Sequence, residues 1–317
     1  MRSGSGRTWH DPVMSLTGHF VILPTPFALD GSVDVGSLRR VIRCSIEGGA
    51  AGLVALGVMG EAAFLDDGER ELVLHAVLDE ADSAVPVIVG VSDDDSAIVA
   101  ERAARVTQLG VDAVMCLLPK DPARLVEHLG AAGAAAKGLV VQDYPLIGHP
   151  VVAADRLSAA IGELPNVVAL KAEDPPTTAK IAAVAAVHPS LPQLGGLGGL
   201  MAYWELRAGS AGTMTGFAYP ELLARLVTLA RGGDDDGARE LYERLLPALV
   251  WEAQAVVGLA LRKHLLHARG LIDDPRLRAP SPPLPAAASE AREVERRTTP
   301  LLGGSYPADS YLATPRG

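Results

Sequence analysis

The sequence predicts an α/β protein whose eight parallel strands, each followed by a helix, close into a (β/α)8 TIM barrel. Short apolar runs recur about every 25 to 30 residues, and an Ala/Leu/Arg/Glu-rich stretch at helical spacing follows each of them. Strands this apolar are typical of a parallel sheet that is buried on both faces. A single barrel of roughly 250 residues also fits a chain of 317 residues.

The eight candidate strands follow in order along the chain, at residues 19–23, 52–56, 85–91, 113–118, 138–142, 167–171, 193–196 and 212–216. Helical stretches follow the first five strands, at residues 35–47, 67–81, 96–109, 123–136 and 153–162. A doubly wound sheet is the rival fold. It is disfavoured because no strand is followed by GxGxxG, and the glycines within residues 195–199 lack that spacing.

Three further helices are expected at residues 220–231, 236–249 and 250–270, where they would pack on the barrel or build a subunit interface. The chain is polar before Met14, and the segment after Pro280 is rich in Pro, Gly, Ser and Thr, so neither end can bury a core. We therefore predict a disordered extension at 1–13, the barrel at 14–219, a C-terminal helical region packed on it at 220–285, and a flexible tail at 286–317.

Composition narrows the class of function. The formal net charge of −10 argues against a nucleic-acid-binding surface and favours a small-molecule partner. No apolar stretch reaches the ~18 to 20 residues of a spanning helix, so we expect no membrane partner and a cytoplasmic protein. Cys44 and Cys116 form no CxxC, and the acidic runs at 93–95 and 234–236 are typical of solvated loops, so no metal site is predicted.

The most informative residue is Lys171, which ends the apolar run at 167–170. The active site of such a barrel lies at the carboxyl ends of its strands, and Lys171 is the only amine among the strand-end residues. A lysine there either keeps its stem in the core and its ammonium in water, or is a desolvated amine that acts as a nucleophile. The residue pattern leaves both open. Glu173 and Asp174 beside it either raise its pKa or only solvate the loop.

A succession of motifs carries a family resemblance. The motifs are Pro24-Thr25-Pro26-Phe27, Gly57-x-x-Gly60-Glu61, Glu69-Arg70, Gly90-Val91, Gly110-Val111-Asp112-Ala113, Pro119, residues 142–145, residues 166–171 and Arg278-x-Pro280. In this order they resemble the dihydrodipicolinate synthase and N-acetylneuraminate lyase family, over about residues 19 to 284. The resemblance implies a Schiff-base-forming lyase on an (α/β)8 barrel with a three-helix C-terminal region. Such proteins are usually homotetramers that act on pyruvate or related 2-oxo acids without a cofactor.

The resemblance also implies that Lys171 forms the imine. A protonated imine draws electrons from the adjacent carbon, which can then become an enamine nucleophile. Because a free lysine is almost fully protonated at neutral pH, we expect burial to lower the pKa of Lys171 toward the working range.

Several positions depart from the family pattern. Gln142 stands where active members carry a proton-relay tyrosine, and a glutamine cannot transfer a proton near neutral pH. Tyr144 lies two residues on and should share a face with Gln142. Its phenol either takes over some of the proton transfer or packs against the next loop.

The loop after the second strand has Val58 and Met59 where the family usually has two hydroxyl residues. The resemblance implies that the backbone N–H groups there still bind the substrate carboxylate, although the hydroxyl of the relay is lost. Glu61 is expected to hold this loop in place rather than to act as a base. The remaining predicted substrate-binding residues stand at strand ends and are Thr25, Gly196, Thr213, Met214 and Thr215.

Two further departures argue against dihydrodipicolinate synthesis, because Lys120-Asp121 replaces an aromatic pair and Ile147 stands in a segment that carries an anion-binding arginine in lysine-biosynthetic members. The leading hypothesis is a lyase or aldolase that makes or breaks a carbon-carbon bond next to a 2-oxo acid. Dehydration of a 2-oxo-3-deoxy sugar acid is a close alternative. A barrel that has lost turnover and serves as a binding or assembly subunit is the rival from another class.

Overall fold

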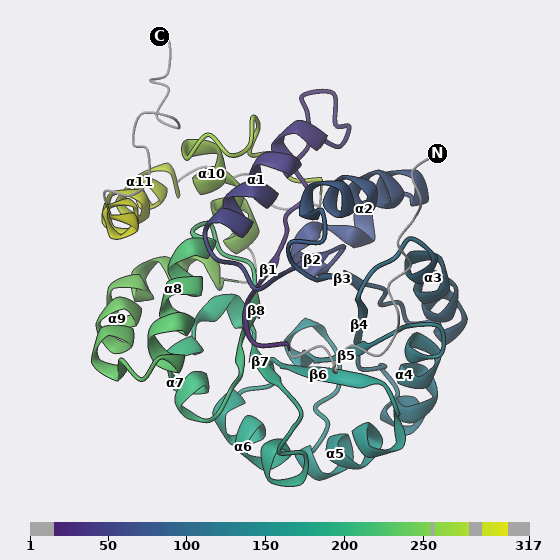
Figure 1. Ribbon diagram of the computed structural model, residues 1–317. Helices are drawn as coiled ribbons and strands as arrows, with labels where there is room; N and C mark the ends of the chain where they lie inside the picture. Colours follow the sequence, from purple (N-terminus) through teal and green to yellow (C-terminus); the bar gives the residue numbers. More distant parts are fainter. Residues whose placement is uncertain (1–15, 255–256, 279–286, 304–317) are drawn as a thin grey trace.

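The computed structural model describes residues 16–254, 257–278 and 287–303. Eight strands form a closed barrel in which each strand is parallel to its two neighbours and β8 pairs with β1 (Figure 1). The strands are β1 Gly18–Ile22, β2 Gly52–Ala55, β3 Val87–Gly90, β4 Ala113–Leu117, β5 Leu139–Asp143, β6 Val167–Ala172, β7 Gln193–Gly195 and β8 Gly212–Thr215. The predicted (β/α)8 barrel is confirmed, with every strand at its expected place.

A helix follows each strand and packs on the outside of the barrel (Figure 1). These helices are α1 Val35–Glu47, α2 Asp67–Ala81, α3 Ser96–Gln108, α4 Leu125–Gly133, α5 Ala154–Glu163, α6 Thr177–Val187, α7 Ala202–Arg207 and α8 Pro220–Arg231. Capping residues fix the first turns of two of these helices. Asp34 accepts a hydrogen bond from the Ser37 N–H at the start of α1, and Asp66 with Glu69 forms a capping box at the start of α2. Short 3-10 helices lie in the loops, at η1 Val58–Gly60, η2 Ala62–Phe64, η3 Pro122–Arg124, η4 Pro145–Ile147, η5 Leu197–Gly199 and η6 Thr299–Leu302.

The alternation of side chains along the strands gives two apolar cores. One fills the barrel and contains, among others, Phe20, Ile22, Val140, Ala169 and Met214. The larger core lies between the barrel and its helices. Membership of the inner core therefore identifies which strand residues point into the barrel, and this decides which side chains can reach an active site at its mouth.

The C-terminal helices α9 Asp235–Glu252, α10 Gly258–Ala268 and α11 Ala287–Thr298 gather at one side of the ring, beside α8 (Figure 1). The predicted helix at 250–270 is wrong at its start, because residues 250–252 belong to α9. Gly258, at the start of α10, lies so close to the end of α9 that a Cβ on it would lie 2.1 Å from the Glu252 carbonyl oxygen. A glycine fits there and a larger residue does not.

The predicted flexible tail at 286–317 is wrong for residues 287–302, which form α11 and η6. Ala291 and Val294, three residues apart on one helix face, are buried in the outer core together with Leu301. Tyr219 and Thr299 also lie within hydrogen-bond distance, with 3.2 Å between their hydroxyl oxygens. This small apolar face was too short to stand out in a charged sequence. The predicted extension at 1–13 lies outside the described residues, as does the end of the tail.

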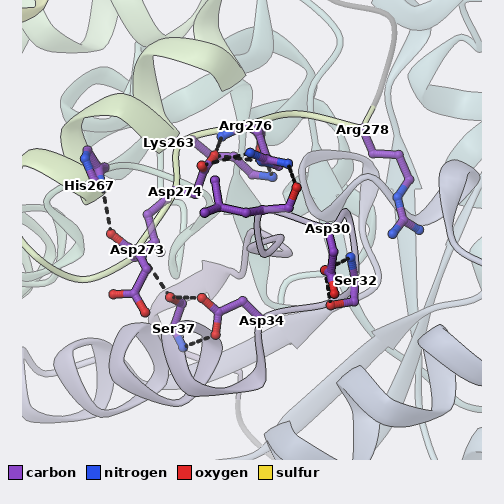
Figure 2. A network of polar contacts seen from close by, with 12 residues as sticks. Asp30, Ser32, Asp34, Ser37, Lys263, His267, Asp273, Asp274, Arg276 and Arg278 are labelled. Carbon is purple, nitrogen blue, oxygen red and sulfur yellow. Dashed lines mark hydrogen bonds and ion pairs between the residues drawn. The ribbon is translucent and has the colours of Figure 1, made fainter.

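The segment after α10 is tied to the first turn of α1 and to the loop between β1 and α1 by a polar network (Figure 2). The Asp273 N–H donates to the Ser37 hydroxyl at 3.0 Å, and the Arg276 guanidinium donates to the Leu29 carbonyl at 2.5 Å. Lys263 donates to the Arg276 carbonyl at 3.0 Å. These contacts fix α10 close to the carboxyl end of β1. Within the described residues, no helix is long and apolar enough to cross a membrane.

Candidate active site

Lys171 lies inside the barrel near its carboxyl end. Ala169 belongs to the inner core, so Lys171, two residues further along β6, points to the same side. Its side chain is buried, with 6% exposed. Gln142 on β5 is its direct neighbour in the register of the sheet. The amine therefore ends in a sheltered position above an apolar layer.

Glu173 is the residue that contacts the amine. It lies two positions after Lys171, and its Oε2 is 2.9 Å from Nζ of Lys171. The same oxygen accepts a hydrogen bond from Nε2 of Gln142 at 2.7 Å. Its other oxygen accepts one from the Leu197 N–H at 3.0 Å. The Glu173 carboxylate thus contacts three donors: Lys171 on β6, Gln142 on β5 and Leu197 just after β7.

Gly196 provides the room for this carboxylate. A Cβ at this position would lie 2.3 Å from both Cγ and Oε1 of Glu173. Gly196 was predicted to bind substrate, and the structure instead brings it against Glu173. The sequence alone leaves the role of Glu173 open, although the period of two along a strand, which relates Gln142 to Tyr144, also relates Lys171 to Glu173.

Asp174 turns away from the amine. It forms an ion pair with Lys180 of α6 at 2.6 Å, and Lys180 also pairs with Asp143 at 2.6 Å. Burial raises the pKa of Asp143, against the opposing effect of Lys180. The two acids that follow Lys171 therefore have different partners, and Glu173 alone faces it.

Tyr144 is half-buried just after β5. Burial raises the pKa of its phenol, the charge of Glu173 raises it further, and the charge of Arg262 opposes them. The phenol therefore keeps its proton at neutral pH. In this state it can donate a proton or a hydrogen bond but is a poor base.

The loop at 57–61 borders a cavity of about 440 Å³ that reaches Gln142. Val58 is 46% exposed beside this cavity, whereas Met59 packs against the inner core. Glu61 is buried, pairs with Lys263 at 2.5 Å and accepts the Arg278 N–H at 2.8 Å. This arrangement suits a residue that holds the loop.

Thr25, in the segment after β1, contacts the same loop. Its hydroxyl donates to the Gly60 carbonyl at 2.6 Å, and its carbonyl accepts from Lys263 at 2.7 Å. Burial lowers the pKa of Lys263, although the charge of Glu61 opposes this shift. Thr25 was predicted to bind substrate, and its observed contacts are with the loop and its anchor.

The three β8 residues that were predicted to bind substrate point to two different faces of the strand. Met214 belongs to the inner core, but Thr213 and Thr215 are on the opposite face. The Thr213 hydroxyl is 2.8 Å from Nδ1 of His19, and burial lowers the pKa of His19 to about 3. The prediction that these two threonines line the substrate wall is therefore corrected. A strand buried on both faces carries no pattern that says which alternate residues point inward.

A buried lysine at the carboxyl end of a barrel strand, with a carboxylate at its amine and an amide bonded to that carboxylate, is the arrangement expected of a Schiff-base-forming lyase. The chain belongs to the dihydrodipicolinate synthetase family, whose model it matches over residues 15–298. This confirms the family resemblance and the lyase class. In the described part of the chain, no group of three or more His, Cys, Asp or Glu residues could hold a metal ion.

Individual relatives have different names. The chain is 30% identical over 298 residues to the L-2-keto-3-deoxyarabonate dehydratase of Azospirillum brasilense, covering 90% of this chain and 95% of that protein. It is 33% identical over 241 residues to a 4-hydroxy-tetrahydrodipicolinate synthase of Xanthomonas axonopodis, covering 73% and 78%. A crystal structure of dihydrodipicolinate synthase from Rhodopseudomonas palustris has a TM-score of 0.85 and 32% identity, and covers 89% of this chain and 98% of that one.

Proposed function

We propose that the protein removes water from a 2-oxo-3-deoxy sugar acid through an imine on Lys171, without a cofactor. The contact between Glu173 and Lys171 carries this proposal. A dehydratase of this type needs a base near the carbon next to the imine, and Glu173 supplies a carboxylate at the amine itself. A named relative is a dehydratase of such an acid, which supports the same choice.

The imine forms first. Glu173 accepts a proton from the Lys171 ammonium, and the free amine adds to the C2 carbonyl of the substrate. The resulting hydroxyl leaves with the proton held by Glu173, as water. The product is a protonated imine beside an ionised Glu173. Gln142 donates a hydrogen bond to the Glu173 carboxylate at 2.7 Å, and in this proposal it keeps that contact during the reaction. In this proposal the N–H groups of Val58 and Met59 bind the substrate carboxylate.

Elimination follows at the next two carbons. Glu173 removes a proton from C3, and the electrons of that bond form the enamine. The enamine then expels the C4 hydroxyl, which takes the proton from Glu173 and leaves as water. Hydrolysis of the imine frees Lys171 and a product that has lost one water overall. A single carboxylate can serve as base and then as acid because it is regenerated at each stage.

Aldol cleavage of a similar acid is the second candidate, and the position of Tyr144 favours it. Cleavage between C3 and C4 needs a base for the C4 hydroxyl and leaves the carbon chain in two parts. Tyr144 borders the site, but the raised pKa of its phenol makes it a poor base at neutral pH. We therefore rank cleavage below dehydration.

The product separates these reactions. Candidate 2-oxo-3-deoxy acids of five and six carbons would be incubated with the protein and the products identified by mass spectrometry. An intact carbon chain that lacks one water supports dehydration, and release of pyruvate supports cleavage. Borohydride trapping with a peptide map should place the adduct on Lys171, and Lys171→Arg should give none. An adduct without turnover of any acid would favour the binding or assembly subunit instead.

We also propose a cytoplasmic homo-oligomer, a dimer or tetramer. Leu146 and Val151, at 62% and 71% exposure, lie after β5 and would be covered by a second copy. Light scattering of the purified protein tests this. A monomer at micromolar concentration would contradict it.

A further inference from the structure

Arg262 of α10 is a buried arginine that the mechanism above does not use. Only 2% of the residue is exposed. Its Nε donates to Oε2 of Glu252 at 2.8 Å, which fixes the plane of the guanidinium. Its Nη1 is buried and has no hydrogen-bond partner among the described residues. A buried donor without a partner is unfavourable, so this group is a candidate for contact with a ligand.

Glu252 holds Arg262 in this position. Both oxygens of Glu252 lie within hydrogen-bond distance of the Ala218 N–H, at 3.1 and 3.2 Å, and the carboxylate is itself buried. The guanidinium is therefore anchored at one end by a group that is fixed to the chain after β8. Its other end, Nη1, is enclosed and has no hydrogen-bond partner among the described residues.

Gly216 is the residue against which Nη1 of Arg262 lies. Met214 points into the barrel, so Gly216, two residues later, is on the inner face just past the end of β8. A Cβ at Gly216 would lie 2.3 Å from Nη1 of Arg262. The guanidinium thus occupies the space above the inner end of β8, at the same end of the barrel as Lys171.

Tyr144 lies within electrostatic reach of both the Arg262 guanidinium and Glu173, the partner of the Lys171 amine. The charges of Glu173 and Arg262 act on its phenol in opposite directions, so both groups lie within electrostatic reach of it. Glu173 contacts Lys171 directly. A substrate that begins at Lys171 and extends past Tyr144 would therefore approach Nη1 of Arg262.

We propose that Arg262 binds a carboxylate at the far end of the substrate, so that the preferred substrate is a 2-oxo-3-deoxy acid with two carboxylates. This rests on the proposed imine at Lys171 and names the substrate class of that site. A carboxylate is the stronger partner than a hydroxyl because hydrogen bonds between two charged groups are about twice as strong as neutral ones. Equal binding of acids with and without the terminal carboxylate is the alternative outcome of the test.

The test uses imine trapping, so it does not depend on turnover. The full-length protein would be treated with borohydride over a range of concentrations of 2-oxopentanedioate and of 2-oxopentanoate. These two acids differ only in the terminal carboxylate. The pair 2-oxohexanedioate and 2-oxohexanoate repeats the comparison with one more carbon. We expect the diacid of at least one pair to reach half-saturation at a concentration about tenfold lower, as one charge-assisted hydrogen bond would give.

Variants assign the preference to Arg262. Arg262→Met should remove it, and Gly216→Ala should weaken it because the new methyl group displaces Nη1 while the charge stays. Arg262→Lys keeps a charge beside Glu252 and tests whether the guanidinium itself is required; it should lose most of the preference. Arg244→Met removes an arginine that is 57% exposed on α9 and should change nothing.

The outcomes are distinct. Equal half-saturation for diacid and monoacid in the wild-type protein would overturn the role of Arg262 and leave the imine chemistry intact. A preference that persists in Arg262→Met would also overturn it. No adduct with any of the four acids or with pyruvate would overturn the imine on Lys171 as well. Trapping of pyruvate itself should be equal in all variants, which shows that the near end of the site is unaffected.

Discussion

The carboxylate of Glu173 lies 2.9 Å from the amine of Lys171, and the two side chains come from the same face of one strand end. This pair places the proposed nucleophile and the candidate base next to each other at the end of β6. The Leu197 N–H fixes the second oxygen of the carboxylate at 3.0 Å, so its orientation does not depend on the amine alone. Such a pair can move a proton without the tyrosine relay that the sequence lacks.

Replacement of Glu173 should slow both imine formation and turnover. Glu173→Gln keeps the size of the side chain and removes its ability to accept a proton. We expect kcat to fall by about 10²- to 10⁴-fold, as for loss of a general base, and borohydride to trap pyruvate on Lys171 more slowly than in the wild type. Asp174→Asn is the matched control, because Asp174 pairs with Lys180 and not with Lys171. Turnover of Glu173→Gln within a few-fold of wild type would exclude Glu173 as the base.

A methyl group at Gly196 should also lower kcat, because it moves the Glu173 carboxylate without changing its chemistry. The added Cβ would lie 2.3 Å from Oε1 of Glu173 and must displace the carboxylate. We expect Gly196→Ala to lower kcat by at least about tenfold, because small displacements of a catalytic group are costly. Gly162→Ala on α5 is the control, since its new Cβ would be 3.8 Å from the nearest side-chain atom. Circular dichroism and kcat of the two variants check this. Equal kcat in both would show that the position of Glu173 is not critical.

The sequence predicted the barrel well because its evidence is periodic. Most strands contain a short apolar run, and helices α1, α2 and α8 begin and end where their caps and spacing predict. The site was harder to predict because the direction of a side chain depends on registry inside the barrel. Thr213 and Thr215 illustrate this, since nothing local distinguishes their face from that of Met214. Arg262 could not be found at all, because its position above Gly216 depends on how α10 packs.

The buried carboxyl of Glu205 should make stability fall as the pH rises. Burial raises the pKa of Glu205 to about 7, from an ordinary value of 4.5. Between these values the folded protein keeps the proton and the unfolded chain loses it, so the free energy of unfolding decreases as the pH increases. Below about 4.5 both states are protonated and there is no penalty. The total change is about 3 kcal/mol, as an order of magnitude.

Glu205→Gln should remove this dependence. Urea unfolding of variant and wild type between pH 4.5 and 8 checks it, within the range where the folded protein persists. The stability difference in favour of the variant should grow through this window and level off above about pH 7. Glu240→Gln, at a position that is 75% exposed on α9, provides the control. A difference that is constant with pH would show that Glu205 ionises normally.

Removal of Lys263 should destabilise the protein through the charge left behind on Glu61. Lys263 is fully buried, pairs with Glu61 at 2.5 Å and donates to the carbonyls of Thr25 and Arg276. Breaking a buried ion pair from one side typically costs about 3 to 5 kcal/mol. We expect Lys263→Met to lose stability of this order in urea unfolding. Its half-saturation for pyruvate trapping should also rise, because the loop at 57–61 loses its anchor.

The double variant Lys263→Met/Glu61→Gln distinguishes the charge from the packing. It removes the uncompensated carboxylate but keeps an amide oxygen that can still accept the Arg278 N–H. It should therefore be more stable than Lys263→Met alone, and the two substitutions should not be additive. If the double variant is as unstable as the sum of the single variants, the pair is not coupled. The loss would then come from the hydrogen bonds of Lys263 to the two carbonyls.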